Sequence, residues 1–514
     1  MKTPILGSSY VTRSVNAADA RMINLYPEII PEGGKEAAWL QRAPGLKLLA
    51  TVGIGPIRGM WAFNNYGYIV SGNTLYRVDT NWLPTSLGTV SGTGPVNMSN
   101  NNTQVYIAAG TYGYIYDTST NTFSQITSAN FYGAVGVGYL DGYFVYNQPG
   151  TQNFWVSNLQ DGLTIQPLNY AAADGAPDNL VTLIVDHREV WLFGSYTVEV
   201  WYDAGLPTFP LARIQGAFNE IGCAAAYSVA KLDNGIFWLG TDQRGKGIVY
   251  RSNGYSGERI STHAVEWQIQ QYSQISDATA YTYQQDGHSF YVLNFPTADR
   301  TWVYDVATQA WHERAGWDND TFTRQRGNCQ MFFNNTNVIG DYRAGAIYSY
   351  DLNVYSEAGT IQKWLRSWRA LPTGQNDLNR SAQHSLQLDC ETGVGLSGYS
   401  QDEVNAIIYI YDRANNFILD RSGSALTIRN YTQYTVTNGA DPQVMLRWSD
   451  DGGHTWSNEH WRSMGQIGQT GYRTIWRRLG MTTKLRDRVY EVSGTDPVKI
   501  AIVGAELHVD GTNA

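Results

Sequence analysis

VYIAAGTYGYIYD, at residues 105–117, is the unit from which most of this sequence is built. A short aromatic strand leads into a turn, and a second strand ends in an aromatic residue and Asp. Apolar side chains that alternate with period two around such a turn predict an antiparallel hairpin. Six similar units recur at spacings of about 37 to 53 residues. They are GYIVSGNTLYRVD (67–79), GYFVYNQPGTQNFWVS (142–157), EVWLFGSYTVEVWYD (189–203), IFWLGTDQRGKGIVYR (236–251), SFYVLNFPTADRTWVYD (289–305) and NVIGDYRAGAIYSYD (337–351).

This spacing is close to the length of a propeller blade. A closed β-propeller fits best, because closing the circle of sheets protects the edges that an open sheet would expose. There are seven units, but one of them can belong to a flanking strand that closes the circle. The sequence therefore predicts six or seven blades.

The pattern changes after about residue 360. The segment IQKWLRSWRALP (361–372) is interpreted as a short amphipathic helix or a linker. Strand-like runs such as VMLRW (444–448) and VKIAIVGAELHVD (498–510) then predict a separate β-sandwich of roughly 150 residues. The predicted fold class is all-β. We expect an N-terminal arm and ring-closing strand at 1–50, a propeller at 51–355 and a sandwich-like domain at 356–514, with an inserted loop around 393–439.

Composition supports this fold class and narrows the functions. Of 514 residues, 52 are Gly, 35 Tyr and 17 Trp, and only 16% are charged, against about 25% in average proteins. The net charge of −9 argues against a protein that grips nucleic acid over its whole surface. Three scattered cysteines suit reduced thiols. The start does not resemble a signal peptide, and no apolar run is long enough to span a membrane. We expect a soluble protein made in a cytoplasm.

One motif invites a catalytic interpretation. In LRWSDDGGHTWSNEHW (446–461), the pattern S-x-D-x-G-x-T-W is formed by Ser449, Asp451, Gly453, Thr455 and Trp456. This is the Asp box that recurs in sialidases. A sialidase would need several boxes in separate blades, an Arg triad, a Tyr–Glu pair and an acid Asp, whereas this box stands alone and outside the repeats. The motif therefore predicts a structural turn.

Other motifs give no better site. The segment DQRGKGIVYR (242–251) lacks the spacing of a phosphate-binding loop, and the eight His residues form no zinc-ligand pattern with the Cys residues. We predict no catalytic residue, cofactor or metal.

A basic segment near the C-terminus stands out. It carries Arg473, Arg477, Arg478, Lys484, Arg486 and Arg488 against the single acid Asp487. These side chains form either a patch that faces DNA phosphates or an acidic neighbouring subunit, or an ordinary solvated strand face. If the patch is an interface, charge reversal at Arg477 and Arg478 should impair assembly.

Long strings resemble one family. INLYPEIIPEGGKEAAWLQRAPGLKLL (23–49), the string at 198–266 that begins VEVWYDAGLPTFPLARIQGAFNEIGC, and WRRLG (476–480) are similar to the packaged-DNA stabilisation proteins of short-tailed phages. These proteins are also called tail hub, nozzle or tail accessory proteins. The resemblance spans nearly the whole chain, and the segment 393–439 is its least typical part.

The resemblance implies a structural virion protein rather than an enzyme. Family members form a hexameric ring below the adaptor that joins the portal, assembled in the bacterial host cytoplasm and located in the virion tail. The implied partners are other copies of the chain, the portal adaptor, a tail needle or plug, tailspikes or fibres, and genomic DNA in transit. The implied task is to close the DNA channel, retain packaged DNA and conduct it during ejection.

Two alternatives remain. A virion-associated, sialidase-like glycan hydrolase would place facing carboxylates in a deep central pocket. A glycan-binding propeller would repeat similar aromatic pockets in each blade, whereas the units here diverge in their turns.

Overall fold

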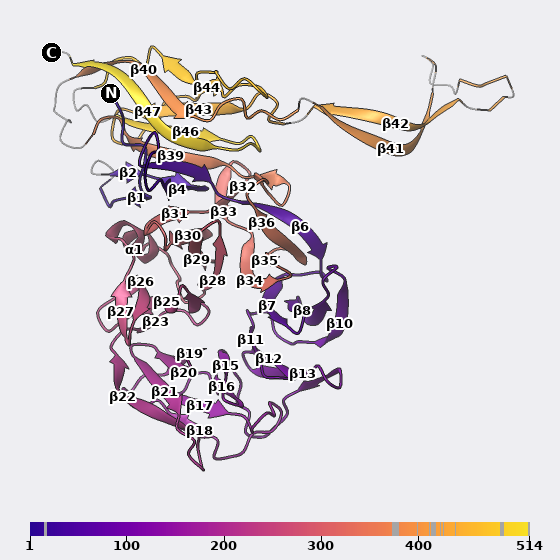
Figure 1. The fold of residues 1–514 in the computed structure, drawn as a ribbon, viewed down its shortest axis with the longest axis vertical. Coiled ribbons are helices and arrows are strands. Elements are labelled where there is room, and N and C mark those ends of the chain that lie inside the picture. The colour runs from indigo at the N-terminus through magenta and orange to yellow at the C-terminus, as the bar shows by residue number, and fades with distance from the viewer. Residues whose placement is uncertain are drawn as a thin grey trace.

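The computed structural model describes residues 1–14, 18–372, 380–397, 399–410, 412, 418–421, 423–424, 426–436, 438–483 and 488–511. Over these residues the chain is built from β-strands, with α1 (His263–Gln270) as its one helix. Figure 1 shows a propeller seen face-on, with a second layered β-domain beside it. The predicted fold class, a propeller followed by a β-sandwich, is confirmed.

The propeller has seven blades, and each quoted repeat forms the two middle strands of one blade. Each blade has four neighbouring strands, the fifth blade has a divided first strand, and the sheets of blades 6 and 7 continue beyond their fourth strands. Blade 1 consists of β7 (Ile57–Phe63), β8 (Tyr66–Ser71), β9 (Thr74–Val78) and β10 (Pro84–Thr89). Blade 2 consists of β11 (Asn97–Asn100), β12 (Gln104–Ala109), β13 (Tyr112–Asp117) and β14 (Thr122–Gln125). Blade 3 consists of β15 (Val137–Leu140), β16 (Tyr143–Asn147), β17 (Asn153–Val156) and β18 (Tyr170–Ala172). Blades 4 and 5 are β19 (Leu180–Asp186), β20 (Glu189–Gly194), β21 (Val198–Asp203) and β22 (Leu211–Asn219); and β23 (Gly222–Cys223), β24 (Ala230–Leu232), β25 (Gly235–Thr241), β26 (Lys246–Asn253) and β27 (Ser256–Arg259). Blade 6 is β28 (Thr279–Gln285), β29 (His288–Phe295), β30 (Arg300–Asp305) and β31 (Ala310–Glu313), and blade 7 is β34 (Gly327–Phe333), β35 (Thr336–Asp341), β36 (Ala346–Asp351) and β6 (Gly45–Thr51).

The N-terminal strand β6 closes the propeller. It pairs antiparallel with β36 as the outer strand of blade 7, from Ala346 opposite Thr51 to Asp351 opposite Gly45. The first and last blades are thereby fastened by hydrogen bonds between segments about 300 residues apart in the sequence. This pairing settles the count that the repeats left open.

Short polar turns join the first two strands of most blades. Asn64 and Asn65 have φ of 50° and 58°, and Asn334 and Asn335 have φ of 50° and 54°. Two consecutive left-handed residues are typical of the type I′ hairpin turn, which Asn and Gly favour. Asn and Asp therefore recur between the strands in the sequence because the turns there require left-handed backbone angles.

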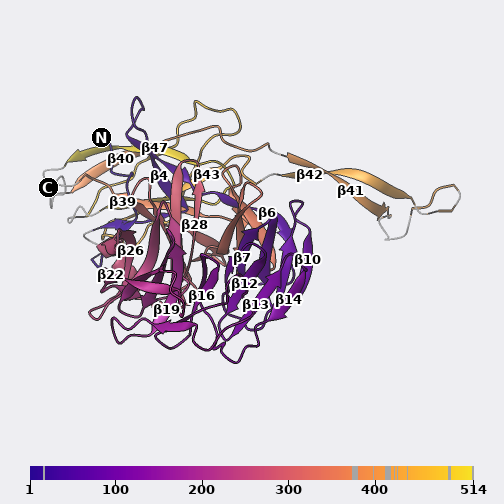
Figure 2. The same cartoon turned by 60° about the horizontal axis from the view of Figure 1, so that its bottom comes forward.

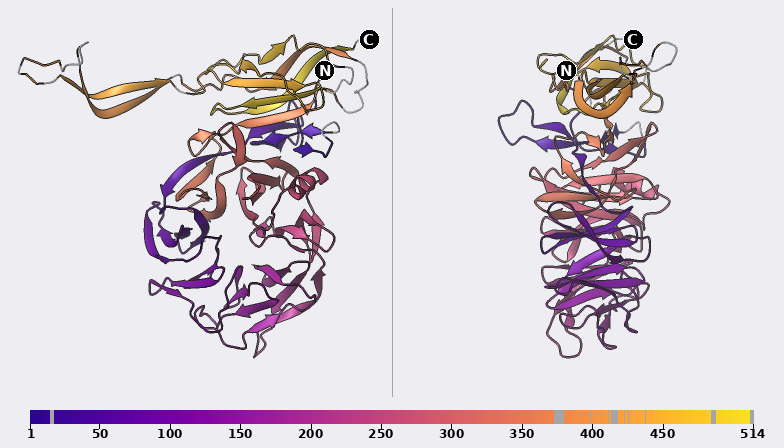
Figure 3. Two further views of the ribbon diagram at one scale, coloured as in Figure 1. Left: turned by 180° about the vertical axis from the view of Figure 1, so that it is seen from behind. Right: turned by 90° about the vertical axis from the view of Figure 1, so that its right-hand side faces the viewer.

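Blade 6 does not end at its fourth strand. Its sheet continues through β3 (Met22–Ile23), β39 (Trp364–Arg369), β46 (Val489–Gly494), β43 (Gln443–Ser449) and β44 (His460–Ser463), which form one layer of the sandwich. The second layer is β4 (Leu25–Ile29), β5 (Ala38–Arg42), β47 (Ala501–Gly511), β40 (Ser381–Cys390) and β45 (Ile475–Arg477). Figure 3 shows the sandwich at the rim of the propeller rather than over one of its faces.

Smaller pairs of strands complete the described fold. They are β1 (Tyr10–Val11) with β2 (Asp19–Ala20) and β32 (Ala315–Asp318) with β33 (Thr321–Arg324). Strands β37 (Ser356–Glu357) and β38 (Thr360–Ile361) instead extend the sheet of blade 7 beyond β6. The sandwich core between the two layers contains Trp364, Trp368 and Trp476 together with Met22 and Leu40 from the N-terminal segment. The first 50 residues are thus shared between the two domains, since β3, β4 and β5 lie in the sandwich and β6 lies in the propeller.

The prediction of a helix or linker at 361–372 is wrong, because residues 364–369 form the central strand β39. Trp364 and Trp368 face the sandwich core, whereas Leu365 packs with Ile23 and Ala315 on the propeller side. A strand buried on both faces shows no polar alternation, so its pattern resembles that of a helix.

The insertion around 393–439 contains two strands instead of an open loop. Strands β41 (Tyr399–Tyr409) and β42 (Thr427–Val436) form a two-stranded sheet that, among the residues described, pairs with no other strand. Figure 2 shows this hairpin projecting away from both domains.

Arginines fasten the sandwich to its surroundings. Arg42 is 1% exposed and donates to the carbonyl oxygens of Asp496 at 2.6 Å, Val498 at 2.8 Å and Tyr355 at 3.2 Å. Arg366 is also 1% exposed and donates to the carbonyl oxygen of Ile5 at 2.6 Å. The accepting carbonyl groups lie outside the strands, so the guanidinium groups satisfy main-chain oxygens that no sheet pairing reaches.

A buried polar cluster lies where blade 6 meets the sandwich. His312 is fully buried and its ring stacks on Tyr26 at 5.8 Å. The guanidinium of Arg314 lies 4.8 Å from the ring centre of Phe290, and His288 shares a 2.8 Å hydrogen bond with Asp305. Burial, followed by the charges of Arg314 and His288, holds the pKa of His312 well below its usual value of 6.5.

The pKa of His312 predicts an acid-sensitive stability. Below about pH 6.5 the unfolded chain binds a proton that the folded chain excludes, so stability present above that pH is lost as the pH falls, by up to about 1.4 kcal/mol per unit. We expect His312→Phe to flatten the fall in thermal midpoint between pH 7 and pH 5. His288 has a raised pKa, so its contribution to stability changes with pH in the opposite direction. Because His288 is unchanged in His312→Phe, this contribution is the same in the wild type and the variant. Equal pH slopes for the two proteins would contradict the assignment to His312.

Candidate functional site

The Asp box closes the loop between β43 and β44 in the sandwich. The Asp451 carboxylate accepts hydrogen bonds from the backbone N–H groups of His454 at 3.0 Å and Thr455 at 2.8 Å, and from the Thr455 hydroxyl at 2.6 Å. The Ser449 hydroxyl donates to Asp451 at 2.7 Å and accepts from the backbone N–H of Gly453 at 2.7 Å. The five motif residues therefore mainly bind one another.

The remaining motif contacts also stay within the loop or its strands. Gly453 has a φ of 107°, in a region that favours glycine. The Trp456 indole N–H donates to the carbonyl oxygen of Gly453 at 3.1 Å, and the Arg447 guanidinium lies 4.7 Å from the Trp456 ring centre. Hydrogen bonds from Ser449, and then from Thr455, hold the pKa of Asp451 well below its usual range. This geometry supports a structural turn.

We expect Asp451→Ala to lower the midpoint of thermal unfolding at pH 7 by a few degrees, because several hydrogen-bond donors of the turn lose their shared acceptor. The depressed pKa of Asp451 makes this contribution present above its unfolded pKa near 3.8 and lost as the pH falls below it. Differential scanning calorimetry at pH 7 and pH 3 should show a smaller difference at the lower pH. Glu459→Ala, on an exposed residue of the same loop, is the control. A wild-type midpoint for Asp451→Ala at pH 7 would contradict this role.

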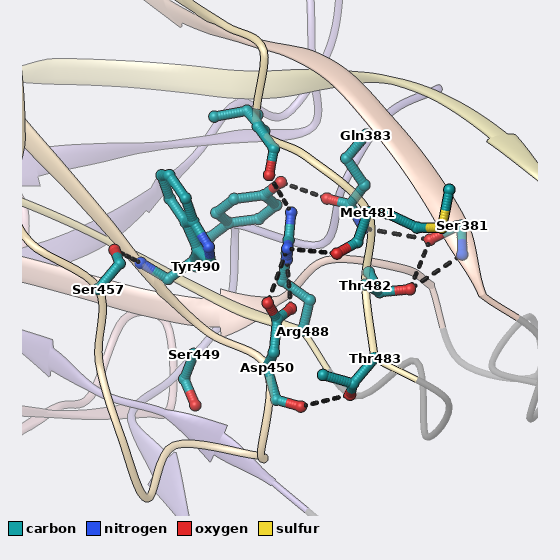
Figure 4. Close-up of polar contacts among 12 residues, drawn as sticks. Ser381, Gln383, Ser449, Asp450, Ser457, Met481, Thr482, Thr483, Arg488 and Tyr490 are labelled. Atoms are coloured by element: carbon teal, nitrogen blue, oxygen red, sulfur yellow. Dashed lines mark hydrogen bonds and ion pairs between the residues drawn. The ribbon is translucent and has the colours of Figure 1, made fainter.

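Arg488 is the one described member of the basic segment that points into the protein. It is 3% exposed, and two of its guanidinium nitrogens donate to the Asp450 carboxylate at 2.6 and 2.8 Å. A third nitrogen donates to the carbonyl oxygen of Leu479 at 2.8 Å. Figure 4 shows the guanidinium held between Asp450, the Met481 carbonyl and Tyr490. This fork–fork geometry makes Arg488 a structural anchor for the loop that carries the Asp box.

The network around Arg488 reaches the opposite sheet. The Tyr490 hydroxyl of β46 hydrogen-bonds the side chain of Gln383 on β40, and the Ser381 backbone N–H donates to the Thr482 hydroxyl at 2.9 Å. The Thr483 hydroxyl donates to the Asp450 carbonyl oxygen at 3.0 Å. Asp450 and Gln383 were not predicted. The only sequence feature that could have indicated Asp450 is its position next to the Asp box, and no sequence feature indicated Gln383.

The other basic residues do not join this anchor. Arg473, Arg477 and Arg478 are exposed, on β45 and the loops beside it. Arg473 donates to the Gln387 side chain at 2.5 Å. Lys484 and Arg486 lie outside the described residues, as does Asp487. A segment that looks continuous in sequence thus divides into a buried arginine and three exposed ones.

The propeller encloses a central cavity of about 710 Å³ between its inner strands. Most of the residues that line it are uncharged. The polar ones include Asn97, Ser99, Thr182, Asn328 and Gln330. Most charged residues of the lining lie near the turns that follow the inner strands, whereas Arg58 lies at the start of β7. The cavity is of a size that holds water or a small molecule.

Both acidic residues that line the cavity have partners. Asp141 receives a 2.8 Å hydrogen bond from Arg188, and Asp186 receives one of 2.7 Å from His187. Lys231 lies 3.5 Å from the same Asp186. The arrangement provides paired charges at the mouth rather than two free carboxylates facing one bond.

Within the described ranges, no group of three or more His, Cys, Asp or Glu side chains is arranged to hold a metal ion. The same residues include no helix long and apolar enough to cross a membrane.

Comparison with protein families decides the class of this chain. The family model described as "Bacteriophage P22 Gp10, beta-propeller" matches residues 1–355, and the one described as "Bacteriophage P22 Gp10, beta-sandwich" matches residues 419–510. The chain belongs to this family. It is a structural protein of a phage tail, of the kind that stabilises packaged DNA. The family's two named domains are those built by the seven blades and by the two sheets beside them.

Other comparisons add little. No curated protein matches the sequence. The computationally designed Ika8 protein is similar at 14% identity and a TM-score of 0.38, over 59% of this chain and 100% of that one. The N-terminal domain of Nup159 is similar at 10% identity and a TM-score of 0.38, over 64% of this chain and 98% of that one.

Proposed function

We propose that this protein forms a ring, hexameric in the assembled virion, at the distal end of the tail tube. The ring closes the DNA channel after packaging, retains the DNA and conducts it during ejection. In this proposal the ring sits beneath the portal adaptor, accepts a needle or plug, and carries tailspikes or fibres around it. Assembly takes place in the bacterial cytoplasm, and no catalytic step is involved.

Family membership is the observation that carries this proposal. The architecture supports it mechanically, because one continuous sheet runs from blade 6 through β3 and β39 to β44. A propeller closed by β6 and a sandwich that shares a sheet with it form a stiff unit suited to bearing load. The net charge of −9 also suits a conduit, since a strongly basic lumen would bind DNA through counterion release and slow its exit.

The test is to assemble particles in a host that lacks this protein, and to examine them by electron microscopy with quantification of encapsidated DNA. The proposal expects capsids that fill, lack the distal ring and then lose their DNA. Complementation with the wild-type protein should restore full, stable particles. Full particles with intact tails that fail only to adsorb would contradict the proposal and favour a glycan-directed propeller.

A further inference from the structure

Exposed arginines and aromatic residues gather where the two sheets of the sandwich meet at their open edge. Strand β44 ends one sheet and β45 ends the other. The Trp476 indole N–H donates to the His460 carbonyl oxygen at 2.7 Å, and the Arg462 guanidinium donates to the Ile475 carbonyl oxygen at 3.2 Å, so the two strands adjoin. We call this surface the edge patch, and it consists of Trp461, Arg462, Tyr472, Arg473, Arg477 and Arg478.

Across the part of the chain that the structure describes, the arginines of the edge patch form no ion pair. Elsewhere in the sandwich, Arg447 lies 2.5 Å from Glu491 and Lys499 lies 2.8 Å from Glu391. Among the residues that the structure describes, Arg477 and Arg478 face no carboxylate within ion-pair distance. Exposed arginines without internal partners are available for an acidic surface on another molecule.

The aromatic members favour a protein as that molecule. Trp461 is 51% exposed and Tyr472 is 43% exposed. Arg, Trp and Tyr are the residues enriched where binding energy concentrates in protein interfaces. Contacts with duplex phosphates come from basic and polar side chains, so an exposed Trp such as Trp461 adds little to them.

A surface of complementary chemistry lies on blade 3. Residues 137–174, which contain the strands of blade 3, include Asp141, Asp161 and Asp174 and no Lys or Arg. Apolar side chains are exposed around β18: Leu159 is 61% exposed, Leu168 68% and Tyr170 44%. Tyr132, in the connection before β15, is 56% exposed and its ring lies 5.6 Å from that of Trp155 on β17. Asp174, exposed just beyond β18, adds negative charge. We call Tyr132, Leu159, Leu168, Tyr170 and Asp174 the blade-3 surface.

The two surfaces cannot meet within one chain. Figure 1 shows β18 at the end of the propeller farthest from the sandwich. A contact between them must therefore join two copies head to tail, and contacts of this kind generate rings when the rotation closes.

We infer that the edge patch of one copy docks on the blade-3 surface of the next copy. This inference rests on the proposed ring and names the contact that builds it. The guanidinium groups approach Asp174 beside a blade that contains no Lys or Arg, and the aromatic side chains of the patch cover its exposed leucines.

The first test reverses charge in the patch. The double variant Arg473→Glu/Arg477→Glu leaves Arg478 unchanged, because its left-handed backbone at φ 63° belongs to a turn. We expect self-association of the full chain, measured by light scattering and native mass spectrometry, to weaken at least tenfold. Arg244→Glu/Lys246→Glu makes the same charge change on exposed residues of blade 5 and should assemble normally. Thermal unfolding of each variant establishes that it is folded.

The second test addresses the acceptor. Leu168→Arg places a positive charge on the blade-3 surface and should also weaken association at least tenfold, whereas Leu168→Glu should be tolerated. Combining Leu168→Arg with Arg473→Glu/Arg477→Glu should recover most of the association. Failure of this combination to recover would overturn the acceptor assignment.

Further outcomes separate the inference from the proposed function. If the wild type and the variant Arg473→Glu/Arg477→Glu both form normal rings, the inferred contact is wrong and the proposed function still stands. If that variant also lost affinity for DNA, the patch would belong to DNA instead. A wild-type chain that stays monomeric at every concentration would count against both this contact and the proposed ring.

Discussion

Replacing Arg488 with alanine is expected to destabilise the sandwich by about 3 kcal/mol, as removal of one partner from a buried ion pair commonly does. The change leaves the Asp450 carboxylate, 27% exposed, without its cation and the carbonyl oxygen of Leu479 without its donor. The midpoint of thermal unfolding should fall by roughly 5–10 °C. Urea denaturation followed by tryptophan fluorescence provides a second measurement, because Arg488 lies 5.5 Å from the ring centre of Trp448.

The matched control is Arg477→Ala, which removes an exposed arginine of the same segment and should change stability by less than about 0.5 kcal/mol. A double-mutant cycle with Asp450→Ala should show that the two residues are coupled. Equal effects of Arg488→Ala and Arg477→Ala would contradict the anchoring role.

Arg42→Ala should have an effect of similar or larger size. Its guanidinium group donates to the main chain of three separate segments, at Tyr355, at Gln362 and at the turn formed by Asp496 and Val498. Each buried acceptor left without a donor costs about 1–3 kcal/mol, so we expect a loss of about 4 kcal/mol. Limited proteolysis should also find new cleavage near residues 355–363, where the chain passes from the propeller to the sandwich.

Arg42→Lys separates charge from geometry. A single ammonium group cannot reproduce the planar fork, so this variant should recover only part of the lost stability. Arg244→Ala, on an exposed turn, is the control for loss of an arginine. Wild-type stability and proteolysis of Arg42→Ala would show that the segments are held together by other contacts.

The sequence predicted the local structure well, and the reason is physical. Hairpins such as 105–117 depend on period-two alternation and on turn residues that lie within about 15 positions of one another. The Asp box is similarly local, since Asp451 binds the backbone of residues three and four positions ahead. These interactions form between neighbours in the chain, so their residues stand together in the sequence.

Patterns failed where pairing partners are distant. Residues 364–369 are a strand because Met22 pairs with Arg366 and Trp364 pairs with Gly494, and no local feature of the segment specifies those partners. The basic run 473–488 looked like a single patch because charge is visible in sequence, whereas the direction of each side chain is not. Asp450 draws Arg488 inward, and Arg477 stays outside.

By itself, then, the sequence determined that this protein is an all-β chain of aromatic hairpins, with a turn-forming Asp box and a resemblance to phage tail proteins. Tertiary structure decided that there are seven blades, that β6 closes them, that the N-terminal segment is divided between two domains, and that blade 6 continues into the sandwich. The difference follows from how far apart in the sequence the hydrogen-bonded residues lie. Turns and hairpins are selected by adjacent residues, but sheet order is selected by which distant strands bury their apolar faces together.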